Sequence, residues 1–284
     1  MATTHTPLRY PGGKSSLTKY VHKLLLTNGL IGCDYAEPYA GGAGLAINLL
    51  LKGFVNHIHI NDLDRAIYSF WFSALNATDL LCEYIEKTPI TLEERAKQKQ
   101  VYENKQKADL ISLGLATLFL NRTNRSGILK AGVIGGKNQI GRYKIDARFN
   151  RITLIKKIRT IASLKAKITI QHTDALDFIK DHCSNLSKPT LINLDPPYYV
   201  KGQMLYQNAY EHSDHKKISA IIPNLKPYWI ITYDNVPQVK ELYSRFPIRT
   251  FNLSYSAHTK YQGKEILIAD PRLELPQDDM MKAS

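Results

Sequence analysis

The stretch Asp195-Pro196-Pro197-Tyr198 directly follows an apolar run, residues 191–194. A carboxylate at the carboxyl end of a strand lies where α/β sheets bind ligands. Proline fixes φ, lacks an N–H and drives the preceding residue to an extended conformation. The two prolines therefore hold the Asp195 carboxylate and nearby carbonyls as rigid acceptors beside the ring of Tyr198. In isolation, Asp-Pro-Pro is typical of a rigid surface turn; with the tyrosine and the strand before it, the arrangement suits a planar base that carries an amino group.

A second candidate group is the glycine-rich turn from Glu37 to Gly44, "EPYAGGAG". Glycines between a strand and a helix let the main chain approach a ligand closely. The next predicted strand ends at Asp62, 20 residues after Gly42. This is near the spacing at which an acid binds the ribose hydroxyls of a nucleotide. A glycine turn alone is often only a structural turn, so Asp62 is the residue that favours a nucleotide-type ligand.

A third candidate is Lys14, which follows two glycines in "LRYPGGKSSL". The segment lacks the spaced first glycine of a phosphate-binding Walker loop. A lysine after a flexible turn could pair with a carboxylate, and Ser15 or Ser16 could cap a helix. Taken alone, the motif is more typical of a surface loop.

The charge of the chain favours a polyanionic partner. Lysines and arginines number 38 against 25 acids among 284 residues, a net charge of +13. Residues 121–159 contain eleven of the basic residues and one acid, Asp146. Because glycines, asparagines and Tyr143 interleave these charges, a nucleic-acid contact surface is a better interpretation than a solvated basic face.

The elements that must position these residues alternate between strand and helix. Helical patterns cover 45–52, 65–75, about 77–120 and 151–164. Strand patterns cover 34–39, 55–62, 167–172, 189–195, 228–234 and 264–270. Such alternation predicts an α/β fold with a mostly parallel sheet and helices on both faces. The helical, basic middle of the chain interrupts the alternation and is interpreted as an insertion.

Other features exclude several classes of protein. The chain has no apolar run long enough for a membrane span and no secretory core at its start, so a cytoplasmic protein is expected. Cys33, Cys82 and Cys183 are too far apart for a zinc cluster and odd in number, which fits a reducing compartment. No metal site is predicted.

Taken in order, the motifs resemble the Dam-like (D12 class) DNA adenine N6-methyltransferases over nearly the whole chain. The segments that carry the resemblance are "RYPGGK", "EPYAGGAG", "INDLD", "LFLNRTNRSGI", "DPPYY", "ITYDN" and "KEILI". Each is modest alone, but the ordered set is specific. The resemblance implies a Rossmann-like S-adenosylmethionine-dependent methyltransferase fold with an inserted, mainly helical target-recognition domain. It divides the chain into catalytic parts at 1–67 and 166–284 and a recognition domain at 68–165.

By the same resemblance, S-adenosylmethionine is the cofactor. Lys14 should lie near its methionine carboxylate, Asp62 should bind its ribose, and Asp174 should lie by its adenine with Ala175 or Leu176 on the ring. Asp174 could equally cap a helix, since Asp177 is nearby. The implied cofactor-binding residues are Tyr10, Lys14, Glu37, Pro38, Tyr39, Gly41, Gly42, Gly44, Asp62, Asp174, Ala175 and Asp195.

The resemblance also implies catalytic and DNA-binding residues. Asp195, Pro196, Pro197 and Tyr198 should act on the exocyclic amine of an adenine flipped out of double-stranded DNA. The expected DNA contacts are Asn121, Arg122, Asn124, Arg125, Ser126, Lys130, Lys137 and Arg142. Two departures are Ser126 before Gly127, which leaves the recognised sequence open, and Tyr39 where phenylalanine is common. The role of Tyr199 is not readable from the sequence.

Several alternatives remain. A cytosine N4-methyltransferase would usually begin the catalytic motif with serine, and RNA or protein-glutamine methyltransferases with asparagine. A non-catalytic DNA-binding module would need neither Asp195 nor the glycine-rich turn nor Lys14, so their presence argues against this alternative. A dehydrogenase would need Gly-x-Gly-x-x-Gly, which "AGGAGLA" does not match. The resemblance suits a monomer that acts at the nucleoid of a prokaryote or for a phage, and it allows a companion restriction endonuclease.

Overall fold

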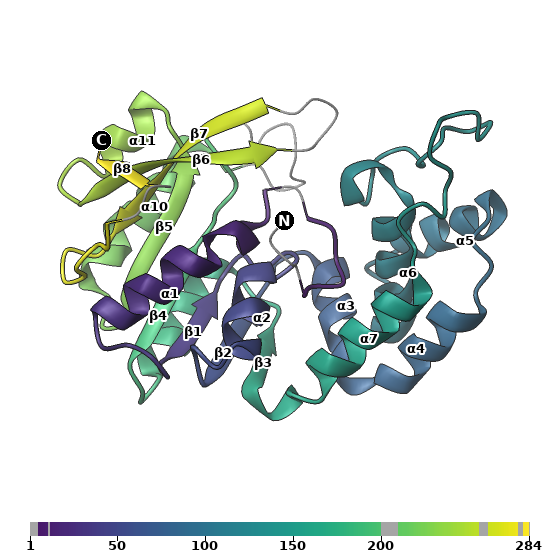
Figure 1. Ribbon diagram of the computed structural model, residues 1–284, viewed down its shortest axis with the longest axis horizontal. Coiled ribbons are helices and arrows are strands. Elements are labelled where there is room, and N and C mark those ends of the chain that lie inside the picture. Colours follow the sequence, from purple (N-terminus) through teal and green to yellow (C-terminus); the bar gives the residue numbers. More distant parts are fainter. Residues whose placement is uncertain (1–4, 11, 200–209, 256–260, 278–280, 284) are drawn as a thin grey trace.

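The computed structural model describes residues 5–10, 12–199, 210–255, 261–277 and 281–283. Among these residues it shows one eight-stranded sheet in the order β3-β2-β1-β4-β5-β7-β6-β8 (Figure 1). The strands are β1 Asp34–Glu37, β2 His57–Asn61, β3 Ile168–Gln171, β4 Thr190–Leu194, β5 Tyr228–Asp234, β6 Ile248–Tyr255, β7 Tyr261–Ala269 and β8 Met281–Ala283. Strands β1 to β5 pair in parallel, whereas β7 is antiparallel to β5 and β6. The predicted mostly parallel α/β fold is confirmed.

The central strands are apolar because both of their faces are covered. Leu191 and Ile230 point into one hydrophobic cluster, and the next residues of the same strands, Ile192 and Ile231, point into another. This alternation follows from the period of two along a strand. It explains why β4 and β5 read as continuous apolar runs in the sequence.

Different helices cover the two faces of the sheet. The first cluster packs against α1 Thr18–Thr27, α2 Gly44–Leu51, α3 Arg65–Asn76 and α7 Arg151–Ala162. The second packs against a short helical stretch, α8 Ala175–Asp177 with the π-helical turn Phe178–His182, and against α10 His212–Ile221 and α11 Pro237–Leu242. The sheet is therefore the middle one of three layers.

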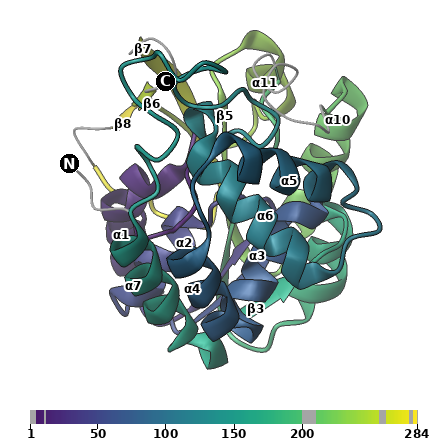
Figure 2. The same cartoon turned by 90° about the vertical axis from the view of Figure 1, so that its right-hand side faces the viewer.

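The chain between β2 and β3 is mainly helical, apart from the loop of residues 128–150. Besides α3 and α7, it forms α4 Thr78–Lys87, α5 Leu92–Glu103 and α6 Leu110–Thr123, on the right-hand side of Figure 1 and facing the viewer in Figure 2. Side-chain caps start several of these helices: Asp64 accepts from the Ala66 N–H, and Asp109 accepts from the Ser112 N–H. The limits of the recognition domain at 68 and 165 stay a prediction.

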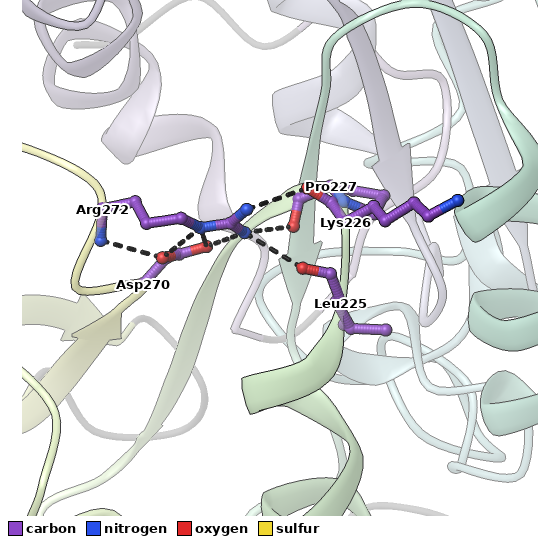
Figure 3. Close-up of polar contacts among 5 residues, drawn as sticks. All are labelled: Leu225, Lys226, Pro227, Asp270 and Arg272. Atoms are coloured by element: carbon purple, nitrogen blue, oxygen red, sulfur yellow. Dashed lines mark hydrogen bonds and ion pairs between the residues drawn. The ribbon is translucent and has the colours of Figure 1, made fainter.

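Arg272 fixes the chain that leads into β5. Its guanidinium pairs with Asp270 and donates to the carbonyls of Lys226 and Pro227 at 3.0 and 2.9 Å (Figure 3). A third bond reaches the carbonyl of Leu225 at 3.1 Å. One guanidinium thereby ties the segment after β7 to the turn that starts β5.

Two further findings concern the described part of the chain. No helix there has the length and apolar character that a membrane span requires. No group of three or more His, Cys, Asp or Glu side chains among these residues could hold a metal ion.

Candidate active site

The candidate site lies at the carboxyl ends of the parallel strands, where the strand order reverses between β1 and β4. Such switch points are where open α/β sheets bind ligands. The glycine turn leaves β1, and Asp195 leaves the neighbouring β4. Segments far apart in the sequence therefore meet at one edge of the sheet.

Both carboxylate oxygens of Asp195 accept short hydrogen bonds. The Thr232 hydroxyl on β5 donates to Oδ1 at 2.8 Å, and the Lys14 ammonium donates to Oδ2 at 2.8 Å. The Lys14 side chain is only 5% exposed, whereas that of Asp195 is 23% exposed. The carboxylate is thus held rigidly from two sides but remains open to a ligand.

The residues after Asp195 form an aromatic wall. Tyr198 is buried, and the Lys14 Nζ lies 5.0 Å from its ring centroid. Tyr199, which the sequence left unassigned, donates its main-chain N–H to Asp234 Oδ1 at 3.0 Å. Its hydroxyl lies 2.9 Å from His212 Nδ1. Tyr199 therefore anchors the motif to the end of β5 and the start of α10.

The glycine turn is shaped by tight contacts that a side chain would break. Gly41 has a φ of +47°, and a Cβ there would lie 2.7 Å from the ring of Tyr10. The Trp71 indole N–H donates to the Gly41 carbonyl at 3.0 Å. Ala43, at φ 44°, starts α2 from the left-handed region. The predicted cofactor residues Tyr10 and Gly41 are in direct contact.

Glu37, at the end of β1, is buried beneath this turn. Its Oε1 accepts from the Tyr35 hydroxyl at 3.2 Å and from the Ala46 N–H at 3.1 Å. Burial raises the pKa of Glu37 to about 8, against the lowering effect of these hydrogen bonds. At neutral pH its carboxyl is therefore largely protonated, which makes it a structural acid below the charged Asp195.

Asp62 follows β2 and is bound to the main chain on both sides. Its Oδ2 accepts from the Gly41 N–H at 2.8 Å, and its Oδ1 accepts from the Asp64 N–H at 2.9 Å. Burial raises the pKa of Asp62 to about 7. The structure thus joins Asp62 to the glycine turn through a direct hydrogen bond.

Asn61, which sequence reasoning missed, connects three loops of the site. Its amide donates to the carbonyls of Pro38 and Thr173, at 3.0 and 3.1 Å, and its Oδ1 accepts from the Thr173 N–H at 3.0 Å. The neighbouring Asp174 caps α8 by accepting from the Leu176 N–H at 2.8 Å. This hydrogen bond is the helix cap that the sequence offered as the alternative role of Asp174.

The structure indicates a different role for two of the predicted DNA contacts. Asn121 and Asn124 are buried, at 1% and 0% exposure. Asn121 exchanges 2.8 Å hydrogen bonds with the main-chain N–H and carbonyl of Arg9. Asn124 donates to the carbonyls of Ile128 and Leu129 and accepts from Arg95. Their amides are used to fold the loop against the N-terminal segment, so they shape this surface from within.

The other predicted DNA contacts lie at or near the surface. Ser126 is half-buried at φ 56°, within the short helical turn Arg125–Gly127. The exposed members are Arg125, Lys130, Lys137 and Arg142. Beyond them, Ile140 is 85% exposed, and the guanidinium groups of Arg142 and Arg148 flank the ring of Tyr143. The surface is basic with apolar and aromatic side chains between the charges.

Four cations gather where the N-terminal segment meets this surface. They are Arg9, Arg122, Arg148 and Lys157. Burial, and then Arg9 and Arg148, lower the pKa of Arg122 to about 10, and Arg122 lowers the pKa of Lys157 in addition to burial. Arg122 also donates to the carbonyls of Arg148 and Pro7. Within the described chain none of the four forms an ion pair. The sequence marked Arg122, Arg148 and Lys157 through the basic segment 121–159, whereas Arg9 lies outside that segment.

Comparisons with known proteins show the family of the chain. The sequence profile of the D12 class N6 adenine-specific DNA methyltransferases matches residues 10–259. The Type II methyltransferase M.MjaIII of Methanocaldococcus jannaschii is 23% identical over 205 residues, which cover 67% of this chain and 68% of the relative.

Two solved structures are loosely similar. A protein from Pyrococcus horikoshii described as an RNA methyltransferase is 10% identical with a TM-score of 0.44, and the rRNA methyltransferase aviRa from Streptomyces viridochromogenes is 12% identical with a TM-score of 0.41. Each comparison covers 93% of this chain and 87% of the other.

The profile spans most of the chain and includes the glycine turn, Asp62 and the Asp195–Tyr198 motif. The sheet order, with β7 antiparallel between β5 and β6, is that of the predicted Rossmann-like methyltransferase fold. The resemblance stated from the sequence is thereby confirmed, and the chain is an enzyme that methylates DNA: it belongs to the D12 class of N6 adenine-specific DNA methyltransferases.

Proposed function

We propose that this enzyme transfers the methyl group of S-adenosylmethionine to the N6 amine of an adenine flipped out of double-stranded DNA, at a specific sequence. The observation that carries the proposal is the Asp195 carboxylate, fixed by Thr232 and Lys14 next to the buried ring of Tyr198. A rigid acceptor beside an aromatic face suits an amino-substituted base, as the sequence suggested.

The residues around the glycine turn fit S-adenosylmethionine. A carboxylate has about four lone-pair sites, and each oxygen of Asp62 uses one for a main-chain N–H. Burial raises the pKa of Asp62 to about 7. Further hydrogen-bond donors, such as the two hydroxyls of a ribose, would favour the charged form of this carboxylate. The glycine turn would hold the methionine part, with the ammonium of Lys14 at the same edge. When bound, the cofactor supplies an electrophilic methyl group.

Asp195 acts on the nucleophile. The N6 lone pair of adenine is delocalised into the ring, so the free amine reacts poorly. Hydrogen bonds from the amine to the Asp195 carboxylate and the Pro196 carbonyl localise that lone pair, and the same preorganised acceptors stabilise the positive charge that develops on nitrogen. Thr232 keeps the carboxylate in one orientation. No covalent enzyme intermediate is required, and positioning supplies much of the rate.

The target base must leave the duplex to reach Asp195. Flipping costs a few kcal/mol in lost stacking. Stacking on an aromatic ring such as Tyr198 returns roughly 1–3 kcal/mol, and contacts to the phosphates offset the rest. We assign these contacts to the exposed residues Arg125, Lys130, Lys137 and Arg142, with half-buried Ser126 beside them. The uncompensated cations Arg9, Arg122, Arg148 and Lys157 add a second group of phosphate contacts.

Asn121 and Asn124 support this surface by holding its loop against Arg9. We further propose that the enzyme acts as a monomer at the nucleoid, in the cytoplasm of a prokaryote or during phage growth. A companion restriction endonuclease remains a prediction.

Mapping modified bases tests the proposal. The chain is expressed in a host free of DNA methylation, and its DNA is read by single-molecule sequencing, with the Asp195→Ala variant as the control. We expect N6-methyladenine at one short recurring sequence with the wild type and none with the variant. N4-methylcytosine at that sequence, or no modification at all, would contradict the proposal.

A further inference from the structure

Lys14 places a buried ammonium group at the centre of the candidate site. Its Nζ donates to Asp195 Oδ2 and to the Gly12 carbonyl, each at 2.8 Å. The same Nζ lies over the ring of Tyr198, 5.0 Å from its centroid. With 5% of its side chain exposed, Lys14 is almost wholly enclosed there.

Two of these groups, the Asp195 carboxylate and the Tyr198 ring, are the ones that the proposed function assigns to the target base. The amine of the base is to donate to the Asp195 carboxylate and to the Pro196 carbonyl, and its ring is to stack on Tyr198, whereas the carbonyl that Lys14 binds is that of Gly12. A cation above an aromatic ring and a hydrogen bond to a carboxylate are favourable for an ammonium as well. Lys14 therefore binds the same carboxylate, Asp195, and the same aromatic ring, Tyr198, that the target adenine needs.

We infer that Lys14 occupies the position of the target amine in the DNA-free enzyme and competes with the flipped adenine for Asp195 and Tyr198. This inference rests on the proposed function. It makes Lys14 a positioning residue that keeps the carboxylate oriented until the base arrives, and that must then withdraw from Oδ2.

The local structure allows both states. A charged carboxylate at a partly buried position is costly when it lacks a partner, so the ion pair stabilises the free enzyme. Lys14 begins the 3-10 turn Lys14–Leu17 directly after Gly12, at φ +75°, and Gly13. If its flexible four-carbon side chain withdraws, the Thr232 hydrogen bond still holds the other oxygen of Asp195.

Base flipping without cofactor tests the inference. The probe is a duplex with the mapped methylation sequence and a 2-aminopurine beside the target adenine, whose fluorescence rises when the adenine leaves the stack. The variants are Lys14→Met and Lys14→Gln, both uncharged, and the control is Lys19→Met at an exposed position of α1. If Lys14 fills the site in about nine of ten molecules, its removal strengthens apparent binding of the flipped base by about tenfold.

We expect both neutral variants to give more flipping than the wild type and the Lys19→Met control, while binding to a duplex without the site is unchanged in each. If thermal unfolding shows that one of the two Lys14 variants is not folded, the other variant is used for the comparison. Flipping equal to or weaker than that of the wild type in the folded neutral variants would overturn the inference. Because the probe uses a sequence already mapped as methylated, such a result would leave the proposed function intact.

Discussion

Thr232 and Asp195 are joined by a 2.8 Å hydrogen bond that crosses two neighbouring parallel strands. Thr232 lies within β5 and is fully buried, whereas Asp195 is the first residue after β4. The pairing of Leu194 with Ile231 sets this register. The orientation of the Asp195 carboxylate is therefore determined by the sheet itself, with Lys14 contributing from the N-terminal segment.

Replacing Thr232 with valine should reduce methyl transfer with little effect on binding. The side chains have nearly the same shape, but valine cannot donate to Asp195 Oδ1. A hydrogen bond to a charged group contributes about 1.5–3 kcal/mol, which corresponds to a fall in kcat of about 10- to 100-fold. Steady-state kinetics would show this, and Thr232→Ser, which keeps the hydroxyl, should recover most of the rate. An unchanged kcat in Thr232→Val would argue against the positioning role.

Alanine at Gly41 should damage both stability and cofactor binding. Its φ of +47° is strained for alanine, and the added Cβ would meet the Tyr10 ring at 2.7 Å. Gly53→Ala is the matched control, because Gly53 also has a positive φ, +69°, but nothing lies within 4 Å of its Cβ. The strain alone costs about 1–2 kcal/mol. Thermal unfolding should show a larger loss for Gly41→Ala, and calorimetric titration should show weakened S-adenosylmethionine binding only in that variant; equal effects would contradict the contact.

Glu37 should make stability depend on pH. Its pKa rises from 4.5 to about 8 on folding, so the folded state binds the proton more tightly. The resulting stabilisation is complete below about pH 4.5 and is lost as the pH rises through about 8. Glu37→Gln lacks this titration and can still accept from Tyr35 and Ala46. Denaturant unfolding from pH 5 to 8 should therefore show the variant gaining on the wild type as pH rises, whereas a constant difference would refute the assigned pKa.

The uncompensated cations should contribute to DNA binding in a salt-dependent way. If Arg148 or Arg122 neutralises a phosphate, replacing it with alanine should reduce the slope of log K against log salt by about one. Lys240→Ala, at an exposed position of α11, is the control and should leave the slope unchanged. Fluorescence anisotropy across a salt series measures this. Unchanged slopes for both arginine variants would exclude them as phosphate contacts.

Much of the fold was predictable because each strand of the parallel sheet is marked locally. Buried runs such as residues 191–194 and 228–234 are largely apolar, and an acid ends each one. The sequence analysis missed β6: its stretch "IRTFNLSY" has two polar residues after Ile248 and alternates between apolar and polar residues only from Phe251 onward. Its place is set by antiparallel pairing with β7, a long-range interaction that no local pattern contains.

The candidate site was predictable in its residue types but not in its partnerships. The motif around Asp195 and the spacing to Asp62 could be read from the chain. The hydrogen bond from Lys14 to Asp195 joins residues that are 181 positions apart in the sequence. The hydrogen bond between Asn121 and Arg9 joins residues that are 112 positions apart. Local sequence patterns do not contain such long-range contacts. The side-chain amide of Asn121 could bind the edge of a base or the main chain of a loop, and the fold determines that it binds the main chain of Arg9.

The most direct test of the account is tritiated methyl transfer to DNA by the Asp195→Ala variant. Asp181→Ala, at an exposed position, is the control, and thermal unfolding confirms that both variants fold. Loss of preorganised charge stabilisation should lower kcat by at least about 100-fold, with DNA binding largely retained. Turnover by Asp195→Ala close to that of the wild type would contradict the claim that this carboxylate activates the target amine.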